Sequence, residues 1–249
     1  MISYAFRSHR GRVRETNEDR FFIPPQEGPL IFAVADGMGG HVAGEVASSL
    51  AVRVLGKKVE QISEDLHQLG QTQAEDFLRT IIEEANTEIV KAQEQQKELK
   101  GMGTTFTAAF IRGRNLLVAH VGDSQAHIFR GDENFKLTED HSLVMELLKN
   151  GEINVEEVYT HPQRHMITRF LGIGDQVSGD FYTLTMEPGD HLLLCTDGLT
   201  EMLRPADVGE VLKEAGARAD LEGIADKLLS QANNRGGSDN ITFILIRLT

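Results

Sequence analysis

The sequence predicts an α+β fold, because the segments that resemble strands come in blocks and those that resemble helices are grouped in pairs. Two kinds of pattern carry this prediction. Short apolar runs rich in β-formers and bounded by Gly, Asp or Asn are typical of strands. Longer stretches with apolar residues three or four positions apart are typical of amphipathic helices.

The N-terminal part of the chain is expected to hold two strands followed by two helices. Residues 2–7 match a short strand, and residues 30–35 form an apolar run that ends at Asp36. Helices are predicted from about residue 44 to 59 and from about residue 74 to 96, where apolar side chains recur every four residues on one face. This order departs from the regular alternation of a parallel α/β fold.

Strands dominate the middle of the chain. Residues 104–111, 116–121 and 125–129 are separated by turns that contain Gly and Asn, so they predict an antiparallel meander. A short helix is expected over residues 143–149, where Asn-Gly closes it. Residues 151–174 have no clean period and are interpreted as an irregular surface excursion, the kind of loop that often borders a functional site.

The C-terminal part returns to strands and closes with a helix and a strand. Residues 181–186 and 191–195 are predicted strands around a Pro-Gly-Asp turn. Apolar residues between 221 and 232 follow the i, i+3, i+4, i+7 template of a helix, and residues 241–248 form the last strand. Nothing resembles a linker, a repeat or a low-complexity tail, so residues 1–249 are expected to form a single domain.

The net charge of the chain indicates which classes of partner it does not bind. Lys and Arg total 25 against 38 Asp and Glu, a net charge of −13. Such a chain repels phosphate backbones and anionic membranes at long range, so we expect neither nucleic acid nor membranes as partners. No stretch approaches the roughly 18 apolar residues of a membrane span, and the N-terminus lacks the apolar core of a signal peptide. We therefore expect a cytoplasmic protein, and we expect it to be a monomer.

The chain has one cysteine, Cys195. A single thiol forms no internal disulfide and no cysteine zinc cage. Its apolar neighbours predict an inert buried thiol. Cysteine-dependent phosphatases carry Arg six positions after the nucleophile, whereas this chain has Glu201 there, so that class is excluded.

Aspartates recur where apolar strands meet Gly-containing turns. Asp36, Asp123 and Asp197 follow predicted strands, and Asp239 precedes the last one. Ordinary turn chemistry explains any one of them, but four such sites suggest that the carboxylates converge. Converged carboxylates repel one another unless cations lie among them. Hard oxygen ligands favour Mg²⁺ or Mn²⁺ over zinc, and two such ions form a hydrolytic centre for phosphate esters.

The segment from Arg14 to Asp19 adds further charge near the N-terminus. The planar guanidinium of Arg14 suits bidentate capture of a phosphate, and the adjacent Glu18 and Asp19 could hold waters on a metal ion. Read alone, this segment is also compatible with an ordinary charged turn.

Eight segments together resemble the metal-dependent protein Ser/Thr phosphatases of the protein phosphatase 2C-like (PPM) family, in its short bacterial branch. They follow the family's order and span nearly the whole chain. They are residues 11–19, 34–41, 101–105, 121–124, 137–142, 167–169, 193–199 and 237–242.

The resemblance implies a four-layer α-β-β-α sandwich, in which helix pairs flank two antiparallel sheets and a flap of about residues 142–178 lies near the metal cleft. It implies direct hydrolysis of phosphoserine and phosphothreonine by a hydroxide that bridges two metal ions, without a covalent phosphoenzyme. Phosphoproteins would be the substrates, and a bacterial Ser/Thr kinase and its targets would be the partners.

The resemblance also implies the metal ligands. Asp36 would bridge two Mn²⁺ or Mg²⁺ ions, with the Gly37 carbonyl on one of them. Asp197 and Asp239 would complete the first metal. Asp123, together with Asp197, would form a third and weaker site.

Other roles follow in the same way. Glu18 and Asp19 would act mostly through coordinated waters, and Arg14 would bind the substrate phosphate. Eukaryotic relatives often carry a His directly after the first Asp-Gly as the general acid, whereas this chain has Met38. His41 is then the candidate acid, and a water on the metal is the alternative.

One more position departs from the family pattern. Gln125 stands where the family often has Arg, and we expect a change in surface contacts without loss of activity. His141, His161 and His165 lack metal-ligand spacing and are expected not to bind metal.

Three rival functions stay open at this point. The chain could be a phosphatase of one regulatory protein, although such proteins usually carry sensor or membrane regions. It could be an inactive binding module, although these tend to lose the metal aspartates. A metal-dependent nuclease is disfavoured by the net charge of −13.

Overall fold

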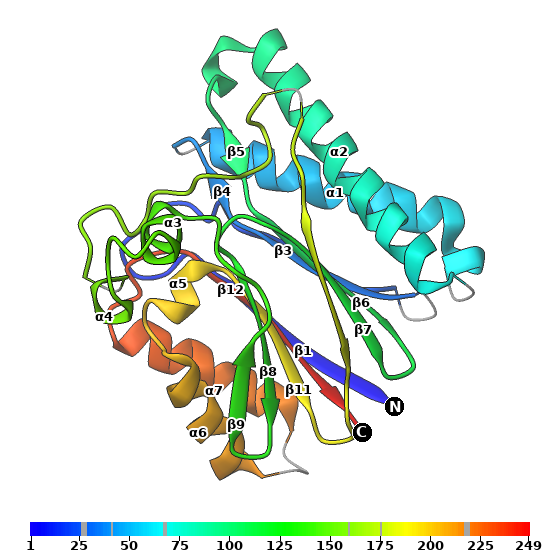
Figure 1. Cartoon of the computed structure of the whole chain (residues 1–249), viewed down its shortest axis with the longest axis vertical. Coiled ribbons are helices and arrows are strands. Elements are labelled where there is room, and N and C mark those ends of the chain that lie inside the picture. Colours follow the sequence, from blue (N-terminus) through cyan, green and yellow to red (C-terminus); the bar gives the residue numbers. More distant parts are fainter. Residues whose placement is uncertain (26–28, 41, 67–68, 159, 175, 217–219) are drawn as a thin grey trace.

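The computed structural model describes the whole chain except residues 26–28, 41, 67–68, 159, 175 and 217–219, and except the side chains of residues 62–66. It contains two five-stranded antiparallel sheets with helices packed on them (Figure 1). The α+β class predicted from the sequence is therefore confirmed.

The first sheet joins the two ends of the chain. Its order is β1 (Ile2–His9), β12 (Ile241–Leu248), β11 (His191–Cys195), β8 (Gln125–Arg130) and β9 (Glu133–Lys136). The first and last strands pair along their whole length, so the termini lie side by side (Figure 1).

The second sheet has the order β10 (Asp180–Thr185), β7 (Asn115–Val121), β6 (Phe106–Arg112), β3 (Leu30–Ala35) and β2 (Arg20–Phe22). A separate two-stranded ribbon, β4 (Gly37–Met38) and β5 (Gly103–Thr104), extends from it.

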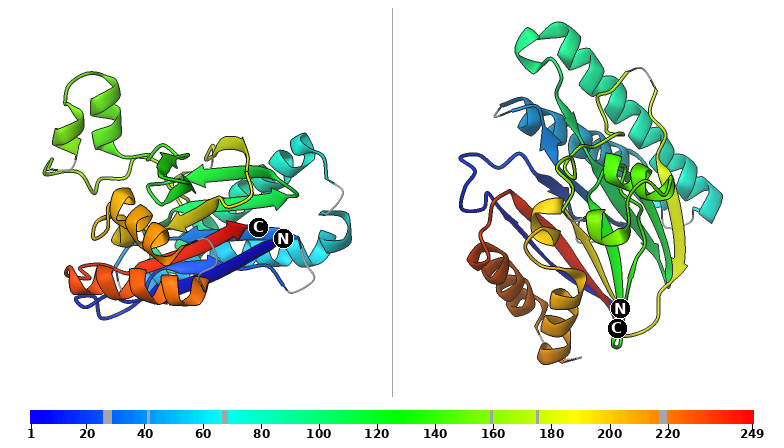
Figure 2. Two further views of the ribbon diagram at one scale, coloured as in Figure 1. Left: turned by 90° about the horizontal axis from the view of Figure 1, so that it is seen from below. Right: turned by 60° about the vertical axis from the view of Figure 1, so that its left-hand side comes forward.

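Two long helices, α1 (Val42–Leu66) and α2 (Gln71–Gln95), cover the second sheet, and α6 (Pro205–Ala215) and α7 (Leu221–Asn234) cover the first (Figures 1 and 2). Shorter helices complete the chain. They are the 3₁₀ helix η1 (Lys97–Leu99) and the helices α3 (Leu143–Lys149), α4 (Val155–Val158) and α5 (Asp197–Thr200).

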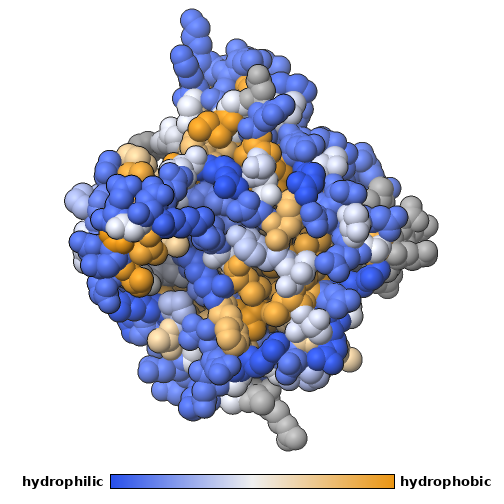
Figure 3. Space-filling view, in the orientation of Figure 1, coloured by the Kyte–Doolittle hydropathy of each residue, from blue (hydrophilic) through white to orange (hydrophobic). Residues whose placement is uncertain are grey.

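Apolar side chains form three clusters, one between the sheets and one under each helix pair. Alternation along β12 shows why: Ile244 and Ile246 face the other sheet, whereas Phe243 and Leu245 face α6 and α7. A strand that is buried on both faces reads as a continuous apolar run, as residues 243–246 do. On the face shown in Figure 3, polar side chains surround apolar ones that gather in the middle.

One expectation about the strands is wrong. Residues 104–111, 116–121 and 125–129 do not form one meander, because β7 pairs with β6 in the second sheet and β8 pairs with β11 and β9 in the first. The chain crosses between the sheets at Gly122, whose φ of +113° is accessible mainly to glycine. This crossing places Asp123 where the two sheets meet.

Other differences concern elements without a clear pattern. β9 is exposed along its whole length and β2 has only three residues, so neither shows the alternation that marks a strand. The irregular excursion contains α4, and α3 and α4 stand out from the body of the molecule (Figure 2). Helix α6 was not predicted, although Pro205 at its start and the buried Val208, Val211 and Leu212 are typical helix signals.

Among the described residues, no helix is both long and apolar enough to cross a membrane.

Candidate metal centre

The predicted aspartates converge at one end of the two sheets. Asp36 follows β3, Asp123 follows β7, Asp197 begins α5 after β11, and Asp239 precedes β12. Asp19, just before β2, joins them. The pKa of Asp36 is raised well above its usual value, first by burial and then by the charges of the other four carboxylates. Both sheets therefore contribute to one acidic cluster.

The main chain of Asp36 is held on both sides. Its N–H donates to Thr105 Oγ1 at 2.9 Å, and its carbonyl accepts from the Thr105 N–H at 2.9 Å and from Thr104 Oγ1 at 2.8 Å. These bonds fix the backbone of Asp36 against Thr104 and Thr105, and its carboxylate lies beside that of Asp197. Gly37, next in the chain, is buried in β4 and pairs with Thr104.

Asp197 and Asp239 are brought together by a close approach at Gly198. A Cβ at that position would lie 2.0 Å from the Asn240 carbonyl oxygen and 3.3 Å from Asp239 Cβ. Only a residue without a side chain lets the start of α5 reach the turn before β12. The glycine that follows Asp197 is thus a packing requirement of the site.

Three carboxylate oxygens of the cluster are buried and lack partners in the described part of the chain: Oδ1 of Asp19, Oδ1 of Asp123 and Oδ1 of Asp197. Asp19 is 1% exposed and Asp123 is 8% exposed. A buried carboxylate without a partner is costly unless it is neutralised or binds a cation. Several hard oxygen donors with orphaned lone pairs fit the ligand preferences of Mn²⁺ and Mg²⁺.

The pKa values of the cluster agree with this interpretation. Burial, with the nearby charges of Asp197 and Asp239, raises the pKa of Asp19 to about 7. Burial and the charges of Glu201 and Asp239 raise the pKa of Asp197 to about 7. Burial and the charge of Asp197 raise that of Asp123 well above its usual value. Divalent cations would relieve both the burial cost and the mutual repulsion.

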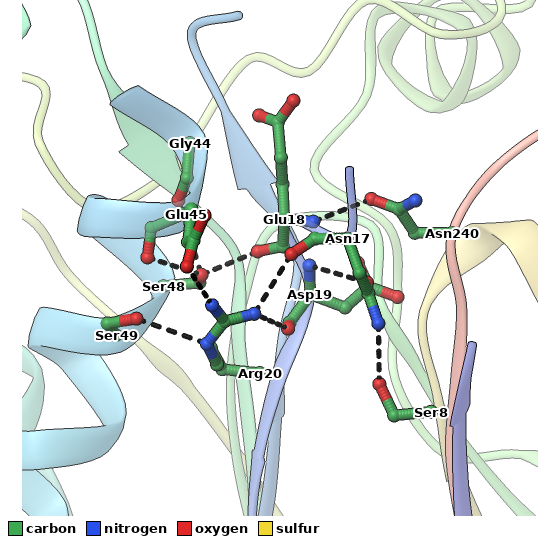
Figure 4. A network of polar contacts seen from close by, with 10 residues as sticks. All are labelled: Ser8, Asn17, Glu18, Asp19, Arg20, Gly44, Glu45, Ser48, Ser49 and Asn240. Carbon is green, nitrogen blue, oxygen red and sulfur yellow. Dashed lines mark hydrogen bonds and ion pairs between the residues drawn. The ribbon is translucent and has the colours of Figure 1, made fainter. Parts of the chain in front are cut away.

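The loop before β2 is locked in place by a polar network (Figure 4). Asn240 Oδ1 accepts from the Glu18 N–H at 2.8 Å, and its Nδ2 donates to the Thr16 carbonyl at 2.8 Å. Arg20 donates to the Asp19 carbonyl at 2.6 Å and pairs with Glu45 of α1 at 2.6 Å. The loop is therefore held between α1 and the turn before β12.

The carboxyl groups of that loop lie at the cluster. Thr196 Oγ1 donates to Asp19 Oδ2 at 2.9 Å, which orients this carboxylate beside Asp197. Glu18 lies against the start of α1, because a Cβ at Gly44 would come within 1.9 Å of Glu18 Oε2. The predicted metal-site residues are thus brought together.

Arg14 lies at the edge of the cluster. Its Nη2 donates to Asp239 Oδ2 at 2.7 Å, and its side chain is 54% exposed. A guanidinium that touches the carboxylate cluster and also faces solvent can meet an incoming phosphate. His41, the candidate general acid, lies outside the described residues.

The structure adds one group that sequence reasoning missed. Ligand atoms of His165, Asp197 and Glu201 lie within 4.8 Å of one another and could hold a metal ion. His165 Nδ1 is 2.9 Å from Glu201 Oε1, so the excursion reaches the residue that caps the end of α5. His165 was expected to have no metal role, but its position makes it a possible ligand. Glu201 could have been found from its position one helical turn after Asp197.

Two minor expectations can be compared with the structure. Gln125 does not make surface contacts but half-buried ones, since its Nε2 donates to Asp140 Oδ2 at 3.0 Å and its Oε1 lies 2.8 Å from His127 Nε2. Cys195 is fully buried, and burial raises the pKa of its thiol to about 12, as expected of an inert cysteine.

Known proteins resemble this chain in both sequence and structure. A family model described as Protein phosphatase 2C matches residues 7–232. The chain is 42% identical over 243 residues to "Serine/threonine phosphatase stp" of Listeria innocua, which covers 97% of this chain and 94% of that relative. The S. agalactiae serine/threonine phosphatase has a similar structure, with a TM-score of 0.90 at 35% identity over 100% of both chains. The catalytic domain of the phosphatase PstP, solved in complex with 2 manganese ions, has a TM-score of 0.84 at 32% identity and covers 99% of this chain and 97% of that one.

Proposed function

We propose a mechanism from the premise that the chain belongs to the protein phosphatase 2C family and is a bacterial protein serine/threonine phosphatase. In this mechanism the protein hydrolyses phosphoserine and phosphothreonine directly at a two-metal centre. The observation that carries the proposal is the convergence of buried and half-buried aspartates from separate strand ends, three of which keep a buried oxygen without a partner in the described part of the chain. No covalent phosphoenzyme is expected, because the single thiol is buried and its pKa is raised to about 12.

The metals would be held by residues of both sheets. Asp36 would bind both ions, helped by the Gly37 carbonyl, and Asp197 and Asp239 would complete one of them. Asp123 would share a third and weaker ion with Asp197. When bound, Mn²⁺ or Mg²⁺ would neutralise the charge of the phosphate and lower the pKa of water.

The chain's own residues bind and orient the substrate. Arg14 would hold the phosphate from the solvent side, where its guanidinium already contacts Asp239. Glu18 and Asp19 would support the centre from the clamped loop. His41 stays the candidate for protonating the leaving serine or threonine oxygen.

We propose that residues 1–249 act as one catalytic domain, with four layers and a flap of residues 142–178 beside the metal centre. The contact between His165 and Glu201 supports that placement of the flap. Phosphoproteins are the substrates, and we propose a Ser/Thr kinase and its targets as the physiological partners.

Two measurements test the proposal. Phosphate release from a phosphothreonine peptide should need Mn²⁺ or Mg²⁺ and should stop when EDTA is added. Acid quenching during turnover of a ³²P-labelled peptide should leave no label on the protein. Activity that persists in EDTA, or label trapped on the enzyme, would overturn direct two-metal hydrolysis.

A further inference from the structure

A polar chain connects the flap to the turn that holds Asp123. At its centre is Asp180, the first residue of β10. Asp180 Oδ1 accepts from Arg169 Nη1 at 2.8 Å, and Oδ2 lies 2.9 Å from His141 Nε2. One carboxylate therefore joins a flap arginine to a core histidine.

The histidine has a defined proton arrangement. His141 Nδ1 accepts from the Gly122 N–H at 2.9 Å, so its ring proton is on Nε2 and is donated to Asp180. His141 is 7% exposed, and burial lowers its pKa. The neutral imidazole thus links the Asp180 carboxylate to the Gly122 backbone through one hydrogen bond on each ring nitrogen.

Main-chain bonds reinforce this link. The His141 N–H donates to the Gly122 carbonyl at 2.7 Å, and the His141 carbonyl accepts from the Thr168 N–H at 2.8 Å. His141 therefore binds both polar groups of Gly122 and also binds the segment that precedes Arg169. Gly122 has a φ of +113°, and Asp123 follows it directly.

The two ends of the chain carry different functions. Asp123 is 8% exposed and its Oδ1 has no partner among the described residues, so its carboxylate is available to a cation. Arg169 belongs to the leg of the flap that returns to the core at Leu171, which pairs with Thr104. Movement of that leg would pull on Asp180 and, through His141, on the Asp123 turn.

We propose that Asp180 is a positioning residue that couples the flap, held at Arg169, through His141 to the Gly122–Asp123 turn, so that flap position sets how tightly Asp123 binds a divalent cation. This inference rests on the proposed role of Asp123 as a ligand of the weaker ion. Residues that orient ligands without touching the metal commonly change metal affinity about ten- to a hundredfold.

The test compares Asp180→Asn with the wild type by titrating Mn²⁺ into the metal-free full chain in a calorimeter. The variant should keep the tighter sites and should bind the weakest ion about tenfold or more weakly. Arg169→Met should act in the same direction, and the double variant should be no weaker than Asp180→Asn alone, because both changes break one chain.

A second readout follows the flap itself. Saturating Mn²⁺ should slow tryptic cleavage within residues 142–178 of the wild type, and this protection should be lost in Asp180→Asn. Asp190→Asn is the matched control, because Asp190 forms a carboxylate–arginine pair with Arg130 at 2.6 Å just beyond the far end of β10. It should keep both Mn²⁺ affinity and protection.

Each outcome decides the proposal. Circular dichroism checks that the variants are folded, and Arg169→Met gives an independent arm if Asp180→Asn is not. Wild-type Mn²⁺ affinity and flap protection in the variants would overturn the coupling. An Asp123→Asn variant that binds as many ions as the wild type would show that Asp123 is not a metal ligand and would overturn the coupling. Activity that needs Mn²⁺ would still support the proposed function in that case.

Discussion

Arg14 and Asp239 form an ion pair at the edge of the acidic cluster, with Arg14 Nη2 2.7 Å from Asp239 Oδ2. The residues are 225 positions apart, so the pair exists only because β1 and β12 are neighbours in the first sheet. The arginine proposed to bind phosphate thus contacts a proposed metal ligand directly.

Replacing Arg14 should therefore damage substrate binding. For Arg14→Ala we expect kcat/KM on a phosphothreonine peptide to fall about ten- to a hundredfold, because a hydrogen bond to a charged group contributes about 1.5–3 kcal/mol. Arg14→Lys keeps the charge but lacks the planar guanidinium, so its kcat/KM should lie between those of the wild type and Arg14→Ala. Steady-state kinetics at saturating Mn²⁺ measure both.

Arg12→Ala is the control in the same loop, because Arg12 Nη2 donates to the neutral Asn234 side chain at 2.9 Å. It should retain wild-type kcat/KM. If Arg14→Ala and Arg12→Ala are equally active, Arg14 has no special part in phosphate binding.

Asp36 should be essential for turnover. Its pKa is raised by burial and by four neighbouring carboxylates, so it lies at the centre of the cluster. Asp36→Asn keeps the shape but removes the charge that would hold two cations, and we expect kcat to fall at least about a hundredfold. Asp132→Asn, a change at an exposed carboxylate that pairs with Lys213, should be fully active. Substantial activity in Asp36→Asn would rule out its bridging role.

Asp197 should make the stability of the metal-free protein depend on pH. Burial and the charges of Glu201 and Asp239 raise its pKa from 3.8 to about 7. Between these values the folded protein keeps a proton that the unfolded chain has released, so its stability falls as the pH rises. Asp197→Asn removes this effect, and its stability relative to the wild type should increase from pH 4 to about pH 7.

Three buried or half-buried histidines act in the opposite direction. Burial lowers the pKa of His120 and His127 to about 3 and that of His191 to about 4, which favours folding as the pH rises toward 6.5. These histidines are present in both proteins, so the difference in melting temperature between them reports the acidic cluster, where the charge of Asp197 also raises the pKa values of Asp19, Asp36 and Asp123. With saturating Mn²⁺ the wild type should be the more stable protein, because the cation binds the folded state. A difference that does not change with pH would contradict the prediction.

The sequence predicted the aspartates of the site better than the hydrogen bonds and strand pairings that connect them. Asp36, Asp123 and Asp197 could be found because each stands at the end of an apolar strand, a pattern that is local in the chain. The hydrogen bonds of Asn240 to Glu18 and of Asp180 to His141 join residues 222 and 39 positions apart, and no local pattern encodes them. The crossing at Gly122 was missed for the same reason, since pairing partners depend on the assembled sheets.

Gly198 gives a test of how precisely the site is packed. A Cβ there would lie 2.0 Å from the Asn240 carbonyl oxygen, a backbone atom that cannot move aside as a side chain can. Gly198→Ala should therefore separate the start of α5 from the turn before β12, lowering the free energy of unfolding by about 1–3 kcal/mol or more and weakening Mn²⁺ binding.

Gly209→Ala is the matched control, because a Cβ within α6 would make only ordinary contacts with Phe129, at 3.8 and 3.9 Å. It should be neutral or stabilising by up to about 1 kcal/mol, since alanine favours a helix over glycine. Urea unfolding and Mn²⁺ titration of both variants separate a local clash from a general cost of adding a methyl group. Equal stabilities and equal Mn²⁺ affinities would mean that the α5 turn can shift without disturbing Asp197 and Asp239.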